Sequence, residues 1–505
     1  MDYPHTGVTF SAGDDFLQKL FDAAEAVCRG NVKDCRGRPV LIEGGGYNSI
    51  YLETQPMGGE MYAKRNLTAA MNNVLVFIEY QLRNGRYPGV VDWRNEQFAP
   101  RYGQFQGFCF PRPALNLYYW NKKRDREYLE RLAGSLEAWD GYLWKYRDSD
   151  GDGCLESWTP VDTGEDHSGR FHGASVVGLE APGWYWPGEK APEGDPVFPI
   201  ESMDVMSYSH DARMTLARLS ALLDDGREAE WRAKARAVRA KIRSSLWDEG
   251  RGACFDRDSA NRTMPTLTHN NLRCMYFGSF EPDMAERFVR EHLFNPAEFF
   301  TPFPLPSIAV NDPCFRNASE NNWSGQSEGL TWQRAIRALE NYGFYAELTI
   351  LGEKLINNVG RRNTFPQQFD PFTGEFSEAD KRADYGPTAL SVLEYMSRFW
   401  GVHLQGDELW WGCLGLSGRK GGEAVYTQQW DGAEYTLHTG GGRCRGSING
   451  KEIFSVSEGA RLVTGWEGGI KKIINMTDSP LEVELHSPAG AQNCTLERNG
   501  VYGGG

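Results

Sequence analysis

Apolar residues recur with a helical period along most of the chain. From about Phe16 to Trp400 they fall at positions i, i+3, i+4 and i+7, as in DFLQKLFDAAEAV and YLERLAGSLEAWDGYLWKYR. Good helix formers occupy the positions between them. The helical segments come in pairs, and the longer linkers between pairs are rich in Gly, Pro, Asp and Trp. This pattern predicts roughly ten to twelve helices, arranged as six helical hairpins.

The pattern changes after Trp400. Short alternating runs such as EAVYTQQW, KEIFSV and LEVELHS follow one another, separated by Gly, Asn-Gly and Asp-Gly turns. The sequence therefore predicts a mainly α chain with two domains: a helical domain over residues 1–402 and a small β domain over residues 403–505. No low-complexity linker separates the two, so we expect them to pack together.

Three long irregular segments interrupt the helical pattern, at about residues 149–203, 299–326 and 363–385. Loops of this length are uncommon inside a compact domain unless they are functional. In a toroid of helical hairpins such loops gather on one face. We therefore expect them to form a cleft there.

Charge and composition narrow the classes of partner. The 505 residues carry a formal net charge of −14, which argues against a nucleic-acid groove and against an anionic membrane surface. No run of about twenty apolar residues suggests a membrane span, and the first residues do not read as a signal peptide. The ten cysteines are scattered, as in a reduced protein, so the sequence predicts a cytoplasmic location.

Aromatic residues are abundant, with 16 Trp, 22 Tyr and 26 Phe. Most are expected in a large core, but many stand beside Gly, Pro and acids in loop-like runs such as CLESWTP and ENNWSGQSEG. A sugar ring stacks its apolar face on an aromatic ring, and its hydroxyls need donors and acceptors at the rim. This combination indicates a small carbohydrate as the partner; the sequence is also compatible with an oligomer.

The loop VDTGEDHSGRF concentrates acids in a short stretch. Asp166, held near Trp158 and Phe171, would be partly desolvated, and desolvation raises the pKa of a carboxyl. A raised pKa keeps a proton available for a leaving group, which is the role of a general acid. The alternative is that Asp162, Glu165 and Asp166 only form turns or cap helices. The residue types alone leave both interpretations open.

The run DSDGDGCLE suggests a metal site. Asp148, Asp150 and Asp152, followed by Gly153, match the first half of an EF-hand loop, with oxygen ligands at alternate positions. Thr159 stands where the closing bidentate Glu would be, so a remote acid would have to replace it. The alternative is an Asx-rich turn between two helices. No cofactor is predicted to be required, and a structural calcium ion is the one metal that the sequence suggests.

Five motifs in order resemble glycoside hydrolase family 63 and its relatives, the mannosylglycerate and glucosylglycerate hydrolases and, more distantly, the trehalases. TGEDHSGRF resembles the acid loop of that family, and RDSDGDGCLE and SMDVMSYSHDARMTLARLSALL resemble the stretches before and after it. FPLPSIAVNDPCF followed by NNWSGQSEGLTWQRAIRALENYG resembles a fourth run, and FDPFTGE followed by DYGPTALSVLEY a fifth. The resemblance covers about Asn31 to Trp400. It implies an (α/α)6 toroid and an inverting glycosidase, with Asp166 at the position of the general acid.

The sequence departs from the family at the catalytic base. The resemblance places Gln367 where the family has its Glu, and an amide cannot accept the proton. Glu328 stands where the family's GPVW run has its Trp, and Gln326 replaces the Pro. We therefore hypothesise that the base has moved to Glu328, with Glu375 and Asp384 as the other candidates. The alternative for Glu328 is a helix N-terminal acid favoured by the helix dipole.

The resemblance also implies residues that contact substrate. Glu53, in YLETQPMGGE, falls on a first-hairpin run whose acid holds sugar hydroxyls. Trp184 and Trp186 could form a lid over the cleft or simply pack within their loop. The complete set predicted to bind substrate is Glu53, Gln55, Trp158, Arg170, Asp204, Trp323, Gln326, Gln367 and Tyr385.

The sequence thus predicts an inverting glycosidase that cleaves a short glycoside, with the α linkage implied by the resemblance. Two alternatives remain at this stage. The first is a sugar epimerase or lyase on the same toroid, for which His167, His172 and His269 would matter. The second is a sugar-binding protein that lost its base, as Gln367 would suggest.

Overall fold

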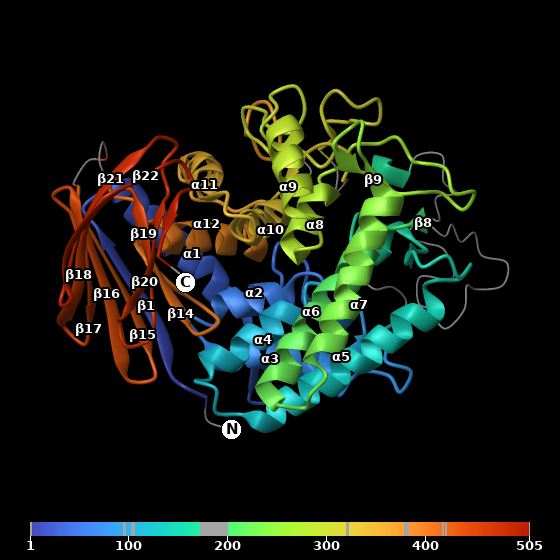
Figure 1. Ribbon diagram of the computed structural model, residues 1–505, viewed down its shortest axis with the longest axis horizontal. Helices are drawn as coiled ribbons and strands as arrows, with labels where there is room; N and C mark the ends of the chain where they lie inside the picture. Colours follow the sequence, from blue (N-terminus) through green and yellow to red (C-terminus); the bar gives the residue numbers. More distant parts are fainter. Residues whose placement is uncertain are drawn as a thin grey trace.

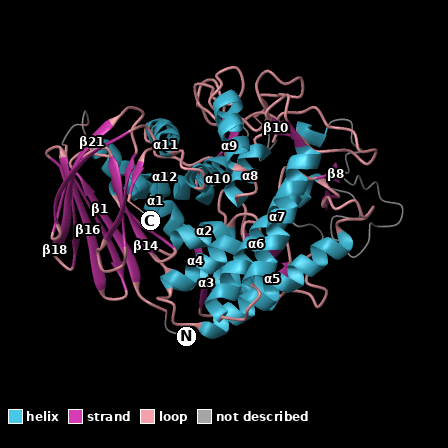
Figure 2. Cartoon of the chain, viewed as in Figure 1, coloured by secondary structure: helices cyan, strands magenta, loops and turns pink. Residues whose placement is uncertain are grey.

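Helices dominate the chain before residue 400 and strands dominate after it (Figure 1). The computed structural model describes residues 3–93, 97–102, 107–171, 200–319, 323–377, 383–416, 419 and 422–503. Figure 2 separates the two regions by colour, with the helices to one side and most of the strands to the other. This confirms the predicted mainly α class with a C-terminal β region.

Twelve α-helices lie in the described part of the chain, in agreement with the predicted number. They are α1 (Asp15–Gly30), α2 (Gln55–Tyr62), α3 (Leu67–Glu79), α4 (Pro111–Trp120), α5 (Arg126–Tyr146), α6 (Met203–Leu223), α7 (Glu228–Lys241), α8 (Asn270–Phe277), α9 (Pro282–Phe288), α10 (Gly329–Glu340), α11 (Tyr345–Val359) and α12 (Gly386–Trp400).

The even-numbered helices contact one another in cyclic order. Each of α2, α4, α6, α8 and α10 packs against the next, and α12 packs against both α10 and α2. Odd-numbered helices lie against this cycle: α1 on α12, α3 on α2, α5 and α7 on α6, and α11 on α10. A helix in this cycle has neighbours on most sides. In α12, for example, every residue is buried. Hydrophobicity all round a helix is expected where neighbours surround it.

Two antiparallel sheets make up most of the β region. The seven-stranded sheet has the order β1 (Thr6–Ala12), β15 (Ala424–Trp430), β16 (Ala433–Gly440), β17 (Arg443–Ile448), β18 (Lys451–Ser457), β21 (Leu481–Ser487) and β22 (Gly490–Leu496). The five-stranded sheet has the order β13 (Val402–Gln405), β14 (Glu408–Cys413), β19 (Ala460–Thr464), β20 (Ile470–Asn475) and β23 (Val501–Tyr502).

The first strand of the chain belongs to the C-terminal sheet. β1 pairs along its whole length with β15, from Thr6 opposite Trp430 to Ala12 opposite Ala424, and Figure 1 shows this blue strand among the orange ones. The division at residue 402 stays a prediction, but the chain contributes to the sheet from both of its ends. The alternating burial of β15 fits the alternation that predicted a strand there.

Short two- and three-stranded ladders complete the helical region. They comprise β2 (Val32–Cys35), β3 (Arg38–Leu41), β4 (Ser49–Tyr51), β5 (Val90–Asp92), β6 (Ala99–Arg101), β7 (Glu156–Ser157), β8 (Ile200–Glu201), β9 (Trp247–Asp248), β10 (Ala253–Cys254), β11 (Ser327–Glu328) and β12 (Gln368–Phe369). Several of them lie in the long segments that the sequence left irregular.

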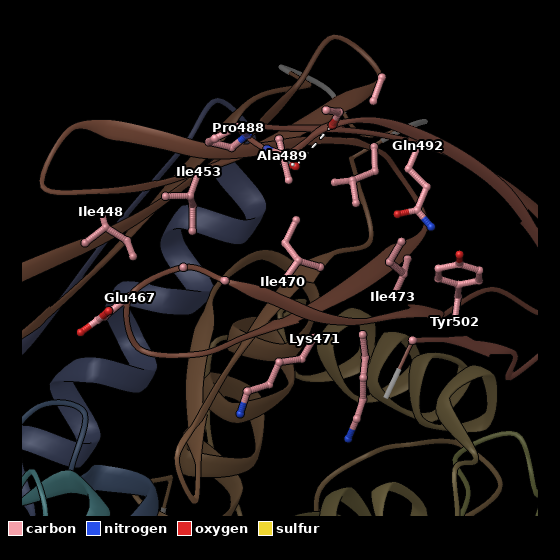
Figure 3. Close-up of a pocket in the computed structure, with 18 of the residues that line it drawn as sticks. Ile448, Ile453, Glu467, Ile470, Lys471, Ile473, Pro488, Ala489, Gln492 and Tyr502 are labelled. Atoms are coloured by element: carbon pink, nitrogen blue, oxygen red, sulfur yellow. Dashed lines mark hydrogen bonds between the residues drawn. The ribbon is translucent and has the colours of Figure 1, made fainter. Parts of the chain in front are cut away.

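A groove of about 710 Å³ opens between β20 and the β21–β22 hairpin (Figure 3). Its lining includes Ile453, Ile470, Ile473, Gln492 and Tyr502. None of the predicted site residues lines it. Elsewhere, no helix in the described ranges combines the length and apolar character needed to cross a bilayer.

Candidate active site

Five of the six helices in the cycle begin beside a candidate site residue. α2 starts at Gln55, α6 carries Asp204 in its first turn, and His269, Glu328 and Tyr385 immediately precede α8, α10 and α12. The first turn of a helix has backbone N–H groups without helical partners and the positive end of the helix dipole. Gathering these ends therefore provides an electrostatic setting that suits carboxylates.

The loop with Asp166 is joined to the segment before α10 by hydrogen bonds. The carbonyl of Asp166 accepts the N–H of Trp323 at 3.0 Å. The hydroxyl of Ser168 donates to the carbonyl of Trp323 at 2.9 Å, and the N–H of Gly169 donates to the hydroxyl of Ser324 at 2.8 Å. The structure therefore brings together two of the three loops that were predicted to form a cleft.

Glu53 lies directly beneath the acid loop. Gly164 adopts a positive φ of 72°, and a Cβ at this position would collide with the Glu53 carboxylate. Burial raises the pKa of Glu53 to about 7, against the opposing effect of the Arg334 and Arg273 guanidiniums. Arg334 forms an ion pair with Glu53, while Arg273 lies 3.9 Å away. The backbone conformation of the acid loop and the position of the Glu53 carboxylate thus both require a glycine at residue 164.

Glu165 is the centre of a buried charge network, which also includes Arg170. Arg170 contacts Glu165 at 2.5 Å, Asp204 at 2.6 Å and Asp256 at 2.6 Å. Although burial alone would raise it, the pKa of Glu165 is held well below its usual value by the guanidiniums of Arg273 and Arg170. The Asn270 amide joins the network by donating to both Glu165 and Asp204 at 2.9 Å. Glu165 is therefore ionised and fixed in place.

Glu328 lies in β11, and Gln367 immediately precedes β12, the partner strand of the same short ladder. Glu328 of β11 is opposite Gln368 of β12, and the N–H of Gly329 donates to the carbonyl of Gln367 at 2.8 Å. The Glu328 side chain is completely buried. The side-chain carbonyl of Gln367 accepts the hydroxyl of Tyr47 at 3.0 Å. The gained acid and the lost acid are thus neighbours in space, although about forty residues separate them in the chain.

Glu43 and two tyrosines complete the same region. The hydroxyl of Tyr385 donates to Glu43 at 2.7 Å, and burial raises the pKa of Glu43 to about 8. Burial likewise raises the pKa of Tyr47, and the charges of Glu43, Asp166 and Glu328 raise it further. Tyr47 therefore lies within electrostatic reach of both predicted catalytic carboxylates.

Other predicted substrate ligands are buried and already engaged. The Gln55 carbonyl accepts the N–H of Tyr51 at 3.0 Å, and the Gln326 amide donates to Asn317 at 3.0 Å. The Trp158 indole donates to Glu156 at 2.6 Å. The Trp323 ring lies 5.4 Å from the imidazole of His269. These contacts orient the side chains, and their predicted roles in substrate binding stay predictions.

The remaining candidates for the base are on the surface. The side chain of Glu375 is 58% exposed and forms an ion pair with Arg362, and Asp384 is exposed as well. A base for a desolvated reaction needs a position inside the cleft. The proposed lid of Trp184 and Trp186, and His172, lie outside the described residues.

Several candidate residues were missed in the sequence, among them Glu43, Tyr47, Glu165, Arg273 and Arg334. Glu43 precedes GGGYNSIY, whose three glycines all have positive φ values of 59–90°. A Gly-rich turn directly after a Glu is the signal in the sequence that could have found it.

The predicted calcium ligands form a compact turn. The carboxylates of Asp148, Asp150 and Asp152 converge within 4.8 Å of one another. The N–H of Gly153 donates to Asp148 at 3.2 Å, and the N–H of Asp152 donates to Asp150 at 3.1 Å. A second group joins Asp152 to Cys154 and Glu201. The sequence predicts that an acid remote in the chain replaces the closing Glu of the EF-hand pattern, and Glu201 is remote in this sense.

Comparison with known proteins identifies the family to which this chain is similar. Residues 61–387 match the family model described as the mannosylglycerate hydrolase MGH1-like glycoside hydrolase domain. No curated protein sequence matches the chain.

Solved structures provide further similarity at the level of the fold. A GH63 mannosylglycerate hydrolase from Thermus thermophilus, in complex with glucose, is 18% identical with a TM-score of 0.62, over 75% of this chain and 100% of that one. The neutral trehalase of Saccharomyces cerevisiae is 15% identical with a TM-score of 0.54, over 74% of this chain and 79% of that one. A protein described as a sialidase is 12% identical with a TM-score of 0.68, over 91% of this chain and 41% of that one.

The family model spans well over half of the chain, including the acid loop, the buried network and the ladder that carries Glu328. The chain therefore belongs to the family of mannosylglycerate hydrolase MGH1-like glycoside hydrolase domains, and it is a glycosidase.

Proposed function

We propose that this glycosidase hydrolyses a short glycoside with inversion on an (α/α)6 toroid, with Asp166 as the general acid and Glu328 as the general base. The cyclic contacts of the six even helices support the toroid. The observation that carries the proposal is that the acid loop is bonded to the segment before Glu328, through the Asp166 carbonyl with the Trp323 N–H at 3.0 Å and the Gly169 N–H with the Ser324 hydroxyl at 2.8 Å. The resemblance to family 63 favours an α linkage.

The chemistry requires two opposed carboxyl groups. Asp166 donates its proton to the glycosidic oxygen as the bond from that oxygen to the anomeric carbon breaks. Glu328 accepts a proton from a water molecule whose oxygen attacks the anomeric carbon from the opposite face. An inverting site holds the two carboxyl groups roughly 6.5–9.5 Å apart, which leaves room for this water. The products are a free sugar of inverted configuration and the aglycone with its hydroxyl restored.

The short ladder of β11 and β12 supports the hypothesis that Glu328 replaces the base that the family has at the position of Gln367. The backbone carbonyl of Gln367 accepts the N–H of Gly329, the residue after Glu328, so the two positions belong to segments that are bonded to each other. In this arrangement Tyr47 holds the Gln367 amide at the rim of the site. Gln367 then binds substrate or water as an amide, and Glu328 performs the proton transfer.

Family membership favours hydrolysis over an epimerase, a lyase or a binding protein. The substrate is proposed to be a small neutral carbohydrate or glycoside, and the cytoplasmic location stays a prediction.

The test is hydrolysis of a panel of natural and aryl α- and β-glycosides by the wild type, Asp166→Asn and Glu328→Gln. General acid–base groups contribute about 10²–10⁴-fold to the rate. We expect each variant to lose activity in this range while keeping its melting temperature, and proton NMR of the first product to show inversion. Full activity of Glu328→Gln would reject Glu328 as the base.

A second variant sharpens the assignment. Gln367→Glu in the Glu328→Gln background restores a carboxylate at the residue that precedes β12, where the family resemblance places the base. We expect it to recover part of the lost kcat, whereas Gln367→Glu alone places two like charges side by side and shifts the pH optimum upward. Failure of the double variant to recover any activity would contradict the idea that the two positions can exchange the base.

We also propose a structural calcium site at Asp148, Asp150 and Asp152, with Glu201, which meets Asp152 in the second group, as the remote acid. The residues fit the ion because Oε2 of Glu201, which is only 6% exposed, accepts no hydrogen bond from a described nitrogen or oxygen donor. Burial raises the pKa of Glu201, and Asp152 and Asp150 raise it further. Lys241 contacts Asp152 at 3.3 Å and would have to yield to the ion.

Calcium titration checks this site. If Ca²⁺ binds the folded state, the melting temperature rises with its concentration and falls when a chelator is added. Asp150→Asn is expected to remove the response, and Asp34→Asn, at an exposed acid in the hairpin of β2 and β3, is expected to retain it. An unchanged melting temperature at millimolar Ca²⁺ would rule the site out.

A further inference from the structure

His269 connects the two halves of the proposed catalytic machinery. Its Nε2 lies 3.1 Å from Oε1 of Glu165, the neighbour of Asp166 in the acid loop. Its Nδ1 lies 3.0 Å from the hydroxyl of Thr331, which belongs to the first turn of α10, three residues after Glu328. One imidazole thus spans the element that carries the acid and the element that carries the base.

The chemistry of its partners fixes the protonation of this imidazole. Glu165 is ionised and can only accept, so Nε2 of His269 must donate to it. Burial lowers the pKa of His269 to about 4, so the ring is neutral near pH 7 and its Nδ1 has no proton. Nδ1 therefore accepts the hydroxyl of Thr331. The imidazole thus donates one hydrogen bond from Nε2 to Glu165 and accepts one at Nδ1 from Thr331. Both bonds of this bridge form while the ring is neutral.

The surroundings hold the bridge rigid. His269 is only 2% exposed, and its ring packs at 5.4 Å against that of Trp323. The backbone N–H of His269 donates to the carbonyl of Ser307 at 3.0 Å. Glu165 is itself fixed by Arg170 and Asn270. A movement of the imidazole would therefore displace either the acid loop or the start of α10.

A second linkage lies between the same two elements. The hydrogen bonds of Trp323 and Ser324 join the backbone of the acid loop to the segment five residues before Glu328. With this backbone linkage and the His269 linkage together, the acid loop is attached to the base segment on both sides of Glu328. Two attachments fix a distance and an orientation, whereas one would leave a hinge.

We propose that His269 is a positioning residue that sets the separation of Asp166 and Glu328 through Glu165 and Thr331. This inference rests on the proposed function, because it requires these two carboxylates to be the catalytic pair. The separation matters because an inverting site must admit one water molecule between the base and the anomeric carbon. Displacing a reacting group by about 1 Å can cost on the order of 10²-fold in rate.

The experiment removes one end of the bridge at a time. Thr331→Val deletes the donor with almost no change of shape, and Thr331→Ser keeps it. His269→Gln keeps a donor in reach of Glu165 but loses the acceptor for Thr331. We expect Thr331→Val and His269→Gln to lower kcat by about 10–100-fold with KM changed less than about threefold. Thr331→Ser should stay within about threefold of the wild-type kcat.

Two controls separate positioning from general damage. Thr349→Val removes the same hydroxyl from a buried threonine of α11, which donates to the carbonyl of Tyr345, and should leave kcat unchanged. The double variant of His269→Gln with Thr331→Val should be no slower than the slower single variant, because both break the same connection. Additive losses, or losses explained fully by a lower folded fraction, would overturn the proposal.

The outcomes distinguish this inference from the proposed function. If Asp166→Asn and Glu328→Gln are inactive but Thr331→Val keeps its kcat, the catalytic pair stands and the bridge is rejected. If Glu328→Gln remains active, the proposed function itself fails, and the bridge fails with it.

Discussion

Two clusters of buried charge among the described residues differ in how their charges are paired. The first is the candidate site, at the start of the even helices. The second, which we call the junction cluster, comprises Lys64, Glu340, Glu394, Arg398 and Arg461 and lies where α10 and α12 meet the β region. In the junction cluster, Glu340 contacts Arg398 at 3.0 Å and Arg461 at 2.8 Å.

The pKa values of Glu340 in the junction cluster and of Glu43 in the candidate site are shifted in opposite directions. Burial alone would raise the pKa of Glu340, but Arg398 and Arg461 hold it below its usual value. At the site, burial raises the pKa of Glu43 to about 8, and its partners are neutral hydroxyls. Buried charge by itself thus marks no function, because structural ion pairs are buried as well. A buried acid such as Glu43, which is bonded to hydroxyls and has a raised pKa, is a better indicator of a functional site than a buried ion pair is.

The largest expected effect is on stability in the junction cluster. Glu340→Gln removes the counter-charge of the buried Arg461 guanidinium and leaves Arg398 paired with Glu394. Breaking a buried pair in this way costs about 3–5 kcal/mol of unfolding free energy. We expect urea unfolding to show this loss, while kcat per folded molecule stays at the wild-type value. A large loss of kcat in the folded protein would mean that the junction cluster takes part in function.

Replacing the site acid Glu43 by Gln is expected to change the unfolding free energy less than Glu340→Gln does, and by an amount that depends on pH. Glu43 is protonated in the folded state up to about pH 8, whereas its usual pKa is 4.5. Its contribution to stability is therefore complete below about pH 4.5 and is lost as the pH rises to about 8. Glu43→Gln should lose less than about 1 kcal/mol at pH 5, because an amide replaces a neutral acid.

The measurement is the unfolding free energy of Glu43→Gln and wild type between pH 5 and pH 8. The variant should be relatively more stable at pH 8 than at pH 5. A difference between the two proteins that does not change with pH would show that Glu43 is ionised when folded, and the contrast between the clusters would disappear.

The smallest effect is expected at the surface. Glu375 pairs with Arg362, and both side chains are more than half exposed. Exposed pairs contribute about 0–1 kcal/mol, so Glu375→Gln should change neither the melting temperature nor kcat appreciably. A hundredfold fall in kcat would instead identify Glu375 as the base and remove that role from Glu328.

The sequence by itself determined the local features. The period of the apolar residues gave the helices, because burial of one face of a helix is a property of neighbouring residues. The alternating runs after Trp400 predicted the β region for the same reason. The acid loop around Asp166 and the turn of Asp148, Asp150 and Asp152 were also found locally, because each is contained in a short segment.

Tertiary structure decided which residues meet. Glu43 bonds Tyr385 across 342 positions of the chain, and Glu165 bonds His269 across 104. β1 pairs with a strand more than 400 residues away. No local period encodes such pairs, since they form only when the helices pack in cyclic order and their first turns converge. The charge state of each buried acid was decided in the same way, because it depends on whether packing brings a cation or a hydroxyl to it.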